Sequence, residues 1–95
     1  MGETLSNHKI YNLTLTNANT EYSQVIVTAP KYISVKCRNT AADIKLTLVA
    51  TESGTVFTTI FGGSEWNTKG SIVGVVTLYL QSPTPNVIAE IESWH

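Results

Sequence analysis

Polar and apolar residues alternate with a period of two along most of the chain, and helical periodicity is almost absent. The clearest case is the segment 32–38, where Ile33, Val35 and Cys37 share one side and polar or charged residues share the other. Successive side chains of a β-strand point to opposite faces of its sheet. The alternation therefore predicts a half-buried antiparallel strand with one face in water.

Turn-forming Asn, Gly, Pro and Ser residues divide the chain into short segments of this kind. Strands are predicted over residues 10–16, 22–28, 32–38, 43–50, 55–61, 64–68, 72–81 and 87–94. The segment 72–81 is the most apolar and is expected at the centre of its sheet, with Gly74 marking a bulge or a close backbone approach. Eight short strands predict an all-β domain, either a small antiparallel β-sandwich or jelly-roll-like fold or, alternatively, a small barrel.

The length of 95 residues suits one domain. We expect residues 1–8 to form a flexible arm and residues 9–95 to form the folded domain. A core this small is modestly stable, and oligomerisation is a common remedy. The longest apolar run, Ile72 to Leu80, is far shorter than the ~20 residues of a membrane-spanning helix. The polar N-terminus lacks signal-peptide features, so neither a membrane partner nor Sec export is expected.

Charged residues make up only 14% of the chain, against about 25% in typical soluble domains, and the net charge is −1. Without a basic surplus, nucleic acid is not an expected partner. A surface rich in Thr, Ser and Asn suits burial against other proteins, because few charges must lose their hydration. The same composition also describes an ordinary Thr-rich β-protein surface, so both interpretations stay open.

Reactive side chains are few and scattered. Cys37 is the single cysteine, so it forms no intramolecular disulfide and is interpreted as a buried apolar residue in a reducing compartment. His8 and His95 stand near the two ends with no metal-ligating partner at suitable spacing. Glu90 and Glu92 share one strand face and could pair as acid and base, but solvent-facing charges that discourage edge aggregation are the simpler interpretation.

Other motifs add no chemistry. Asp43 is the single aspartate, which disfavours a calcium site. Gly62-Gly63 lacks the Lys-Ser or Lys-Thr of a phosphate-binding loop. We therefore expect no enzyme activity, catalytic residue, metal or cofactor.

Aromatic and loop residues are the better candidates for contacts with a partner. Most aromatics are expected in or beside the core, but Trp66 stands among polar residues between glycines and is expected outside it. Polarity and position single out the arm, Trp66 and the rigid loop 83–86. The predicted partner-contact residues are Glu3, Leu5, His8, Trp66, Pro83, Pro85 and Asn86.

Residues 11–24 read Tyr-Asn-Leu-Thr-Leu-Thr-Asn-Ala-Asn-Thr-Glu-Tyr-Ser-Gln, a short strand followed by an Asn-rich turn and a Thr-Glu-Tyr-Ser step. This segment resembles the opening of small proteins of about a hundred residues encoded by tailed phages. Residues 35–39, Val-Lys-Cys-Arg-Asn, resemble the next strand. Residues 77–82 and 89–94 are similar to their closing strands and to their terminal Glu-x-x-Trp, where this chain reads Glu92-Ser93-Trp94. The likeness covers most of the chain from Tyr11 onward, with residues 62–69 departing most from the pattern.

The resemblance implies a β-sandwich virion structural protein, most simply a capsid decoration or cement protein that binds and stabilises the shell. Its partner would be the major capsid protein or another virion protein. Its location would be the capsid surface after assembly in the host cytoplasm. Decoration of threefold positions would favour a homotrimer. The alternative is a carbohydrate- or receptor-binding module of a fibre or tail, which predicts two or more exposed aromatics on one face with Asn and Glu nearby. A jelly-roll enzyme would need clustered histidines, which two histidines do not provide.

Overall fold

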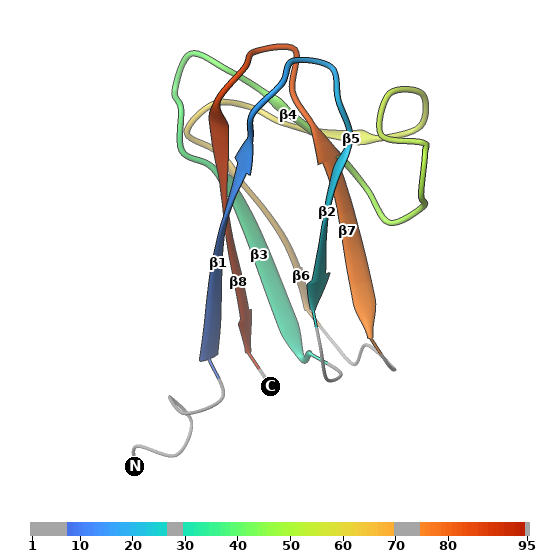
Figure 1. Cartoon of the computed structure of the whole chain (residues 1–95). Helices are drawn as coiled ribbons and strands as arrows, with labels where there is room; N and C mark the ends of the chain where they lie inside the picture. The colour runs from blue at the N-terminus through green and yellow to red at the C-terminus, as the bar shows by residue number, and fades with distance from the viewer. Residues whose placement is uncertain (1–7, 27–29, 70–74, 95) are drawn as a thin grey trace.

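The computed structural model describes residues 8–26, 30–69 and 75–94, which form eight β-strands (Figure 1). The strands are β1 (His8–Leu15), β2 (Tyr22–Ile26), β3 (Tyr32–Cys37), β4 (Ile44–Thr47), β5 (Thr58–Ile60), β6 (Glu65–Lys69), β7 (Val76–Gln81) and β8 (Val87–Trp94). Each lies within or close to a segment of alternating residues, which confirms the predicted all-β class. No membrane-crossing helix is found among the described residues.

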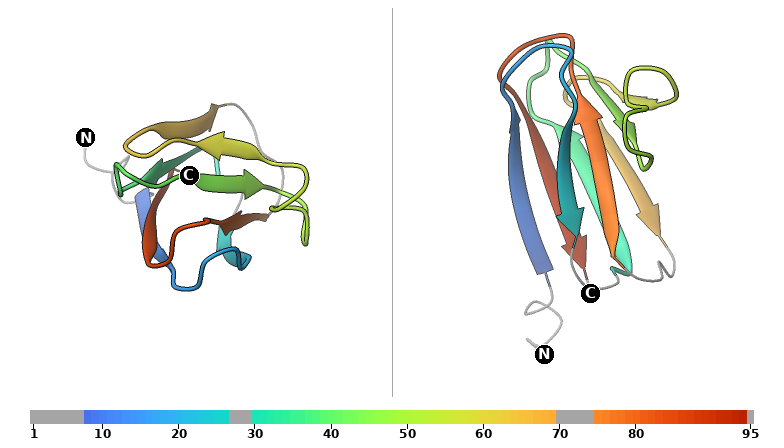
Figure 2. Two further views of the ribbon diagram at one scale, coloured as in Figure 1. Left: turned by 90° about the horizontal axis from the view of Figure 1, so that it is seen from above. Right: turned by 45° about the vertical axis from the view of Figure 1, so that its right-hand side comes forward.

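Two four-stranded antiparallel sheets face each other and form a sandwich (Figures 1 and 2). The strand order is β1-β8-β3-β6 in the first sheet and β2-β7-β4-β5 in the second. Every connection crosses from one sheet to the other except β4 to β5, which are consecutive and paired. Eight strands in these two interleaved sheets make the jelly-roll-like form of the sandwich. The most apolar strand, β7, lies between β2 and β4, which confirms its predicted central position.

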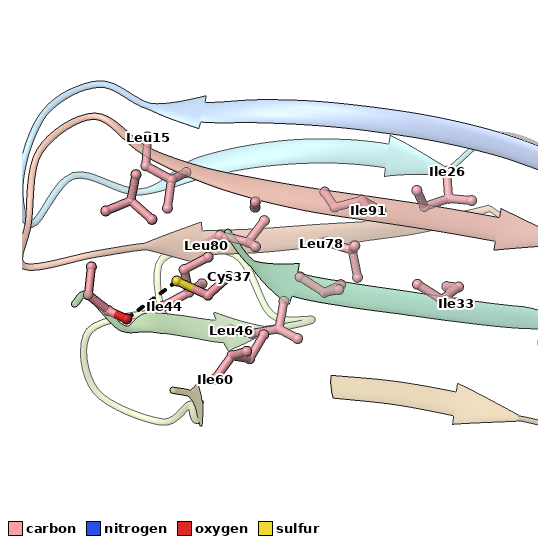
Figure 3. Packing of buried hydrophobic residues seen from close by; sticks show 14 residues of the cluster. Leu15, Ile26, Ile33, Cys37, Ile44, Leu46, Ile60, Leu78, Leu80 and Ile91 are labelled. Atoms are coloured by element: carbon pink, nitrogen blue, oxygen red, sulfur yellow. Dashed lines mark hydrogen bonds between the residues drawn. The ribbon is translucent and has the colours of Figure 1, made fainter. Parts of the chain in front are cut away.

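The core fills the space between the sheets, where the inward side chains of both interdigitate (Figure 3). In β8, Val87, Ala89 and Ile91 are fully buried and the glutamates alternate with them toward the outside, as predicted. The buried cluster consists of Leu15, Ile26, Ile33, Val35, Cys37, Ala42, Ile44, Leu46, Ile60, Leu78, Leu80, Val87, Ala89 and Ile91.

Two sequence-based expectations about position need correction. Trp66 stands outside the buried cluster, as expected, but its side chain faces inward: it lies opposite Val35 in the register of β6 and β3, is half-buried and packs against the core. Its direct neighbours, Glu65 and Asn67, occupy the outward positions of the same strand. His8 belongs to β1 rather than to the arm, since it pairs with Trp94.

Two strands of the second sheet, β4 and β5, are shorter than predicted. β4 ends at Thr47 instead of Ala50, and β5 begins at Thr58 instead of Thr55. The apolar side chains between the two strands are exposed, so strand-favouring composition overestimated their length here. The proposed irregularity at Gly74 lies outside the described residues.

A carboxylate anchors the connection between β4 and β5. Glu21 accepts hydrogen bonds from the Thr51 N–H at 2.9 Å and from the Ser53 N–H and hydroxyl at 3.2 and 2.6 Å. Gln81 of β7 donates to the Ser53 hydroxyl at 2.8 Å, and Ser53 is fully buried. The Ser53 hydroxyl, helped by the two backbone N–H groups and opposed by burial, lowers the pKa of Glu21 below its ordinary 4.5. The connection is thereby held to the start of β2 and the end of β7.

Candidate functional site

The described residues contain no cluster of three or more His, Cys, Asp or Glu side chains that could hold a metal ion. Cys37 is buried, and its thiol points to the backbone oxygens of Asn39 and Ala42, each 3.4 Å from Sγ. Burial raises the pKa of Cys37, so the thiol is held in its unreactive protonated form. The prediction that Cys37 is a buried apolar residue is confirmed, and the residues around it belong to the packing of the core.

The loop between β7 and β8 is held tightly to the end of the sandwich. Asn86 has a left-handed backbone with φ of 60°, and its N–H donates to the Leu15 oxygen at 2.8 Å. The Thr84 N–H donates to the hydroxyl of the buried Ser82 at 3.1 Å. Two prolines, Pro83 and Pro85, restrict the remaining backbone. The loop is therefore preorganised, and its exposed side chains would be ordered at little entropic cost when a partner binds.

A hollow of about 570 Å³ opens between this loop and the connection from β3 to β4. The two walls are joined by hydrogen bonds from the Arg38 N–H to the Ile88 oxygen, at 3.1 Å, and from the Ile88 N–H to Asn39 Oδ1, at 3.4 Å. The side-chain polar atoms of Thr40, Thr84 and Asn86 have no hydrogen-bond partner among the described residues. The lining consists of Arg38, Asn39, Thr40, Ala41, Ala42, Thr84, Asn86 and Ile88.

The predicted contact residues fall into separate places. Pro83, Pro85 and Asn86 are exposed on the loop end, and Asn86 also lines the hollow. His8 lies in β1, near the opposite end of the sheet, and Trp66 packs against the core. Glu3 and Leu5 lie outside the described residues. The structure thus brings together only the loop members of the predicted set.

A group of three rings occupies the outer face of the first sheet. His8, Trp94 and Tyr32 are direct neighbours across β1, β8 and β3. The His8 and Trp94 rings stack, with centroids 4.5 Å apart and planes 12° apart, and Tyr32 meets Trp94 edge-on at 4.9 Å. His8 Nε2 also lies 3.3 Å from Glu92 Oε1. The three side chains are half-buried, so their rings present only part of their surface to solvent.

Paired polar groups cover the rest of this face. Glu90 accepts a hydrogen bond from the Arg38 guanidinium, whose other arm reaches Asn12 at 3.4 Å. Ser34 donates to Glu65 Oε2 at 2.6 Å. Glu65 and Glu90 are thus each paired with a neighbouring donor on the outer face of this sheet.

Exposed apolar side chains gather on the connection from β4 to β5, which projects beyond β7 (Figures 1 and 2). Phe57 and Phe61 flank β5 and are 37% and 63% exposed. The Lys45 ammonium lies 4.9 Å from the centre of the Phe57 ring, which places Phe57 on the outward side of this sheet. The remaining exposed members are Leu48, Val49 and Val56.

Sequence reasoning missed the ring group and the wall of the hollow formed by the β3–β4 connection. The outward positions of Tyr32 and Trp94 were readable from the alternation in their own strands. Their contact depends on the register of β3 against β8, for which the sequence carries no local signal. Arg38 was predicted to end the strand 32–38, and residues 39–42 were interpreted only as the connection that follows it. Their meeting with residues 84–88 in three dimensions makes residues 38–42 a wall.

No family model matches the chain, and no curated protein sequence matches it. Among solved structures, the chain is similar to a de novo designed double-stranded β-helix determined by solution NMR. The likeness covers 92% of this chain and 99% of the designed one, with a TM-score of 0.59 and 11% sequence identity. At that identity the likeness shows the fold alone: an all-β sandwich of two four-stranded sheets that resembles a double-stranded β-helix.

Proposed function

We propose that this chain is a structural accessory protein of a phage virion, which binds the capsid shell through protein–protein contacts and does not catalyse a reaction. The observation that carries the proposal is the preorganised loop end, where Pro83, Pro85 and Asn86 stand exposed beside an open hollow. The virion setting rests on the resemblance of residues 11–24, 35–39, 77–82 and 89–94 to small phage proteins.

The chemistry of the loop end suits a protein partner. Thr40, Thr84 and Asn86 offer hydroxyl and amide groups that form no hydrogen bond with the part of the chain that the structure describes, with Ile88 beside them in the lining. Groups of this kind can bind backbone amides without the loss of hydration that buried charges cost. On a shell, the same contact is repeated many times. An oligomer of this chain can therefore bind the shell firmly through contacts that are individually weak.

The test uses empty shells of the phage that encodes the chain, and measures co-sedimentation of the full chain with them. The variant Asn86→Gly removes the amide but keeps the left-handed backbone, which glycine adopts without strain. Its matched control is Asn19→Gly, because Asn19 is also left-handed, with φ of 56°, but lies outside the lining of the hollow. We expect Asn86→Gly to weaken shell binding by about tenfold, as for a central interface residue, and Asn19→Gly to leave it unchanged.

Two results would contradict the proposal. The first is a wild-type chain that stays in the supernatant at all shell concentrations. The second is a cryo-EM map of the intact particle without density for the chain on the shell. If both glycine variants weaken shell binding equally, the contact does not lie at the hollow, and the loop end does not have the role assigned to it.

A second candidate function is favoured by the rings on the first sheet. The carbohydrate-binding alternative predicts two or more exposed aromatics on one face with Asn and Glu nearby. Tyr32 and Trp94 share one face with Glu92, and both rings are half-buried. A glycan array would test it, with Trp94→Ala as the disrupting variant and Tyr79→Ala, on the other sheet, as control. Sugar binding that is lost in Trp94→Ala and kept in Tyr79→Ala would favour this function. Silence of the wild-type chain across the array would remove it.

A further inference from the structure

The edge strand β5 lies in a stretch without charge. No Asp, Glu, Lys or Arg occurs from residue 53 to residue 64, and residues 55–61 read Thr-Val-Phe-Thr-Thr-Ile-Phe. Among the described strands, β5 is paired with β4 alone, so the N–H and C=O groups on its other side lie along an open edge. Natural proteins protect such edges with charges, prolines, bulges or very short strands, because an open apolar edge pairs readily with another strand. Of these devices β5 has only its short length of three residues.

The other edge strands differ from β5. β1 carries Lys9, and β6 carries Glu65 and Lys69. β2 is uncharged, but its exposed residues are Ser23 and Val25 and it has no outward aromatic side chain. β5 thus combines an open edge, absence of charge and flanking exposed aromatics more fully than the other described edge strands.

We infer that β5 binds β5 of a second copy of this chain, antiparallel, about a twofold axis that passes through Thr59. This register places Phe57 of each copy opposite Phe61 of the other. Both phenylalanines continue the outward side of the strand, since Thr59 pairs with the half-buried Lys45 and Ile60 points into the core. The pairing is self-complementary, as a twofold interface requires, and it creates two cross-strand aromatic pairs.

The two phenylalanines supply part of the apolar area that an interface needs. The exposed fractions of Phe57 and Phe61, 37% and 63%, together equal about one whole phenylalanine side chain. That is roughly 150–250 Å² per copy, or 300–500 Å² in the pair, of the ~1,600 Å² of a standard interface. Paired backbone adds to it. Because the pairing is twofold and self-complementary, it forms a dimer in place of the trimer that threefold shell positions would favour.

Sedimentation equilibrium of the full chain over a range of concentrations tests the inference. We expect the wild type to be in a monomer–dimer equilibrium. Phe61→Lys, which places a charge on the pairing edge, should raise the dissociation constant by at least about tenfold. Ile10→Lys is the matched control. The exposed fraction of Ile10, 59%, is similar to the 63% of Phe61, but Ile10 lies on the other sheet. It should leave the dissociation constant unchanged.

A pair of double variants tests the register itself. Phe57→Glu with Phe61→Lys sets opposite charges across the interface, whereas Phe57→Glu with Phe61→Glu sets like charges at the same positions. Within one copy these two positions lie too far apart along the strand for their side chains to meet. The Glu/Lys variant should therefore associate about tenfold more tightly than the Glu/Glu variant. Circular dichroism of each variant checks that the monomer is folded.

Each remaining outcome overturns the inference. A wild type that is monomeric at all concentrations, or that forms trimers, excludes the twofold pairing. Equal loss of association in Phe61→Lys and Ile10→Lys excludes β5 as its site. Equal dissociation constants for the two double variants exclude the register through Thr59. None of these results depends on shell binding, so the proposed function stands or falls separately.

Discussion

Replacing Glu21 by glutamine should loosen the connection between β4 and β5 and lower the stability of the whole domain. The carboxylate accepts three hydrogen bonds, from the N–H groups of Thr51 and Ser53 and from the Ser53 hydroxyl. Glutamine has nearly the same shape but carries no charge, and its NH₂ group cannot accept. At least one donor therefore loses its partner, and the other bonds become neutral ones.

The size of the effect follows from these bonds. A hydrogen bond to a charged group contributes about 1.5–3 kcal/mol and a neutral one about 0.5–1.5 kcal/mol, so each exchange costs roughly 1 kcal/mol. Glu21 is half-buried and keeps contact with water, which reduces the difference. We expect a loss of about 2 kcal/mol in the free energy of unfolding at pH 7, or a fall of roughly 10 °C in Tm for a domain this small.

The direction in which the stabilisation by Glu21 changes with pH follows from its lowered pKa. Because the pKa of Glu21 is lowered in the folded state, the folded chain holds this proton less readily than the unfolded chain. The carboxylate therefore stabilises the fold above its unfolded pKa of 4.5, and this stabilisation is lost as the pH falls through the lower folded value. The difference between wild type and Glu21→Gln should be full at pH 7 and shrink steadily below about pH 4.5.

Urea unfolding followed by circular dichroism at several pH values measures both effects. Glu52→Gln is the matched control, since Glu52 stands on the same connection and its carboxylate accepts no hydrogen bond from the described residues. The reasoning fails if Glu21→Gln costs no more than Glu52→Gln at pH 7. It fails equally if the cost of Glu21→Gln is the same at pH 3 as at pH 7.

Three further predictions follow from the packing. Gly62→Ala should destabilise the domain by about 3 kcal/mol in chemical unfolding, because its Cβ would come within 2.4–2.6 Å of the backbone oxygens of Asn39, Thr40 and Ala42. Gly54→Ala should cost far less, since its Cβ meets only the flexible end of Gln81 at 3.1 Å. Trp66→Ala should cost about 2–3 kcal/mol, whereas an exposed interface side chain would cost almost nothing. Cys37 should react with a thiol reagent only as fast as the domain opens, and rapid labelling under native conditions would contradict its burial.

The sequence predicts well which side chains share a face within one strand, because side chains alternate between the two faces. Ile33, Val35 and Cys37 were expected on one side of β3, and all three are in the core. It predicts poorly whatever depends on which strands meet. Trp66 was expected outside the core because polar residues surround it along the chain, yet its side chain shares the inward side with Val35 across the sheet.

The same limit applies to the candidate site. The loop 83–86 was identified from its prolines and asparagine, and it is one wall of the hollow. The opposite wall comes from residues 38–42, which are distant in sequence and carry no pattern of their own. A wall formed by two loops requires the strand order β8-β3, and alternation is the same for every order of strands.

The strand order also explains why the exposed apolar residues gather where they do. A connection that crosses between the sheets delivers the next strand to the facing layer, where its apolar side meets the core. β4 and β5 alone remain in one sheet, and Glu21 and Gln81 hold their connection at Ser53 to the edge of the sandwich. Phe57 and Phe61 lie on the outward side of this sheet, which no other described layer covers, whereas Ile60 of β5 points into the core. Two exposed phenylalanines on an open, uncharged edge invite association with other chains, and a partner strand at β5 would remove that exposure.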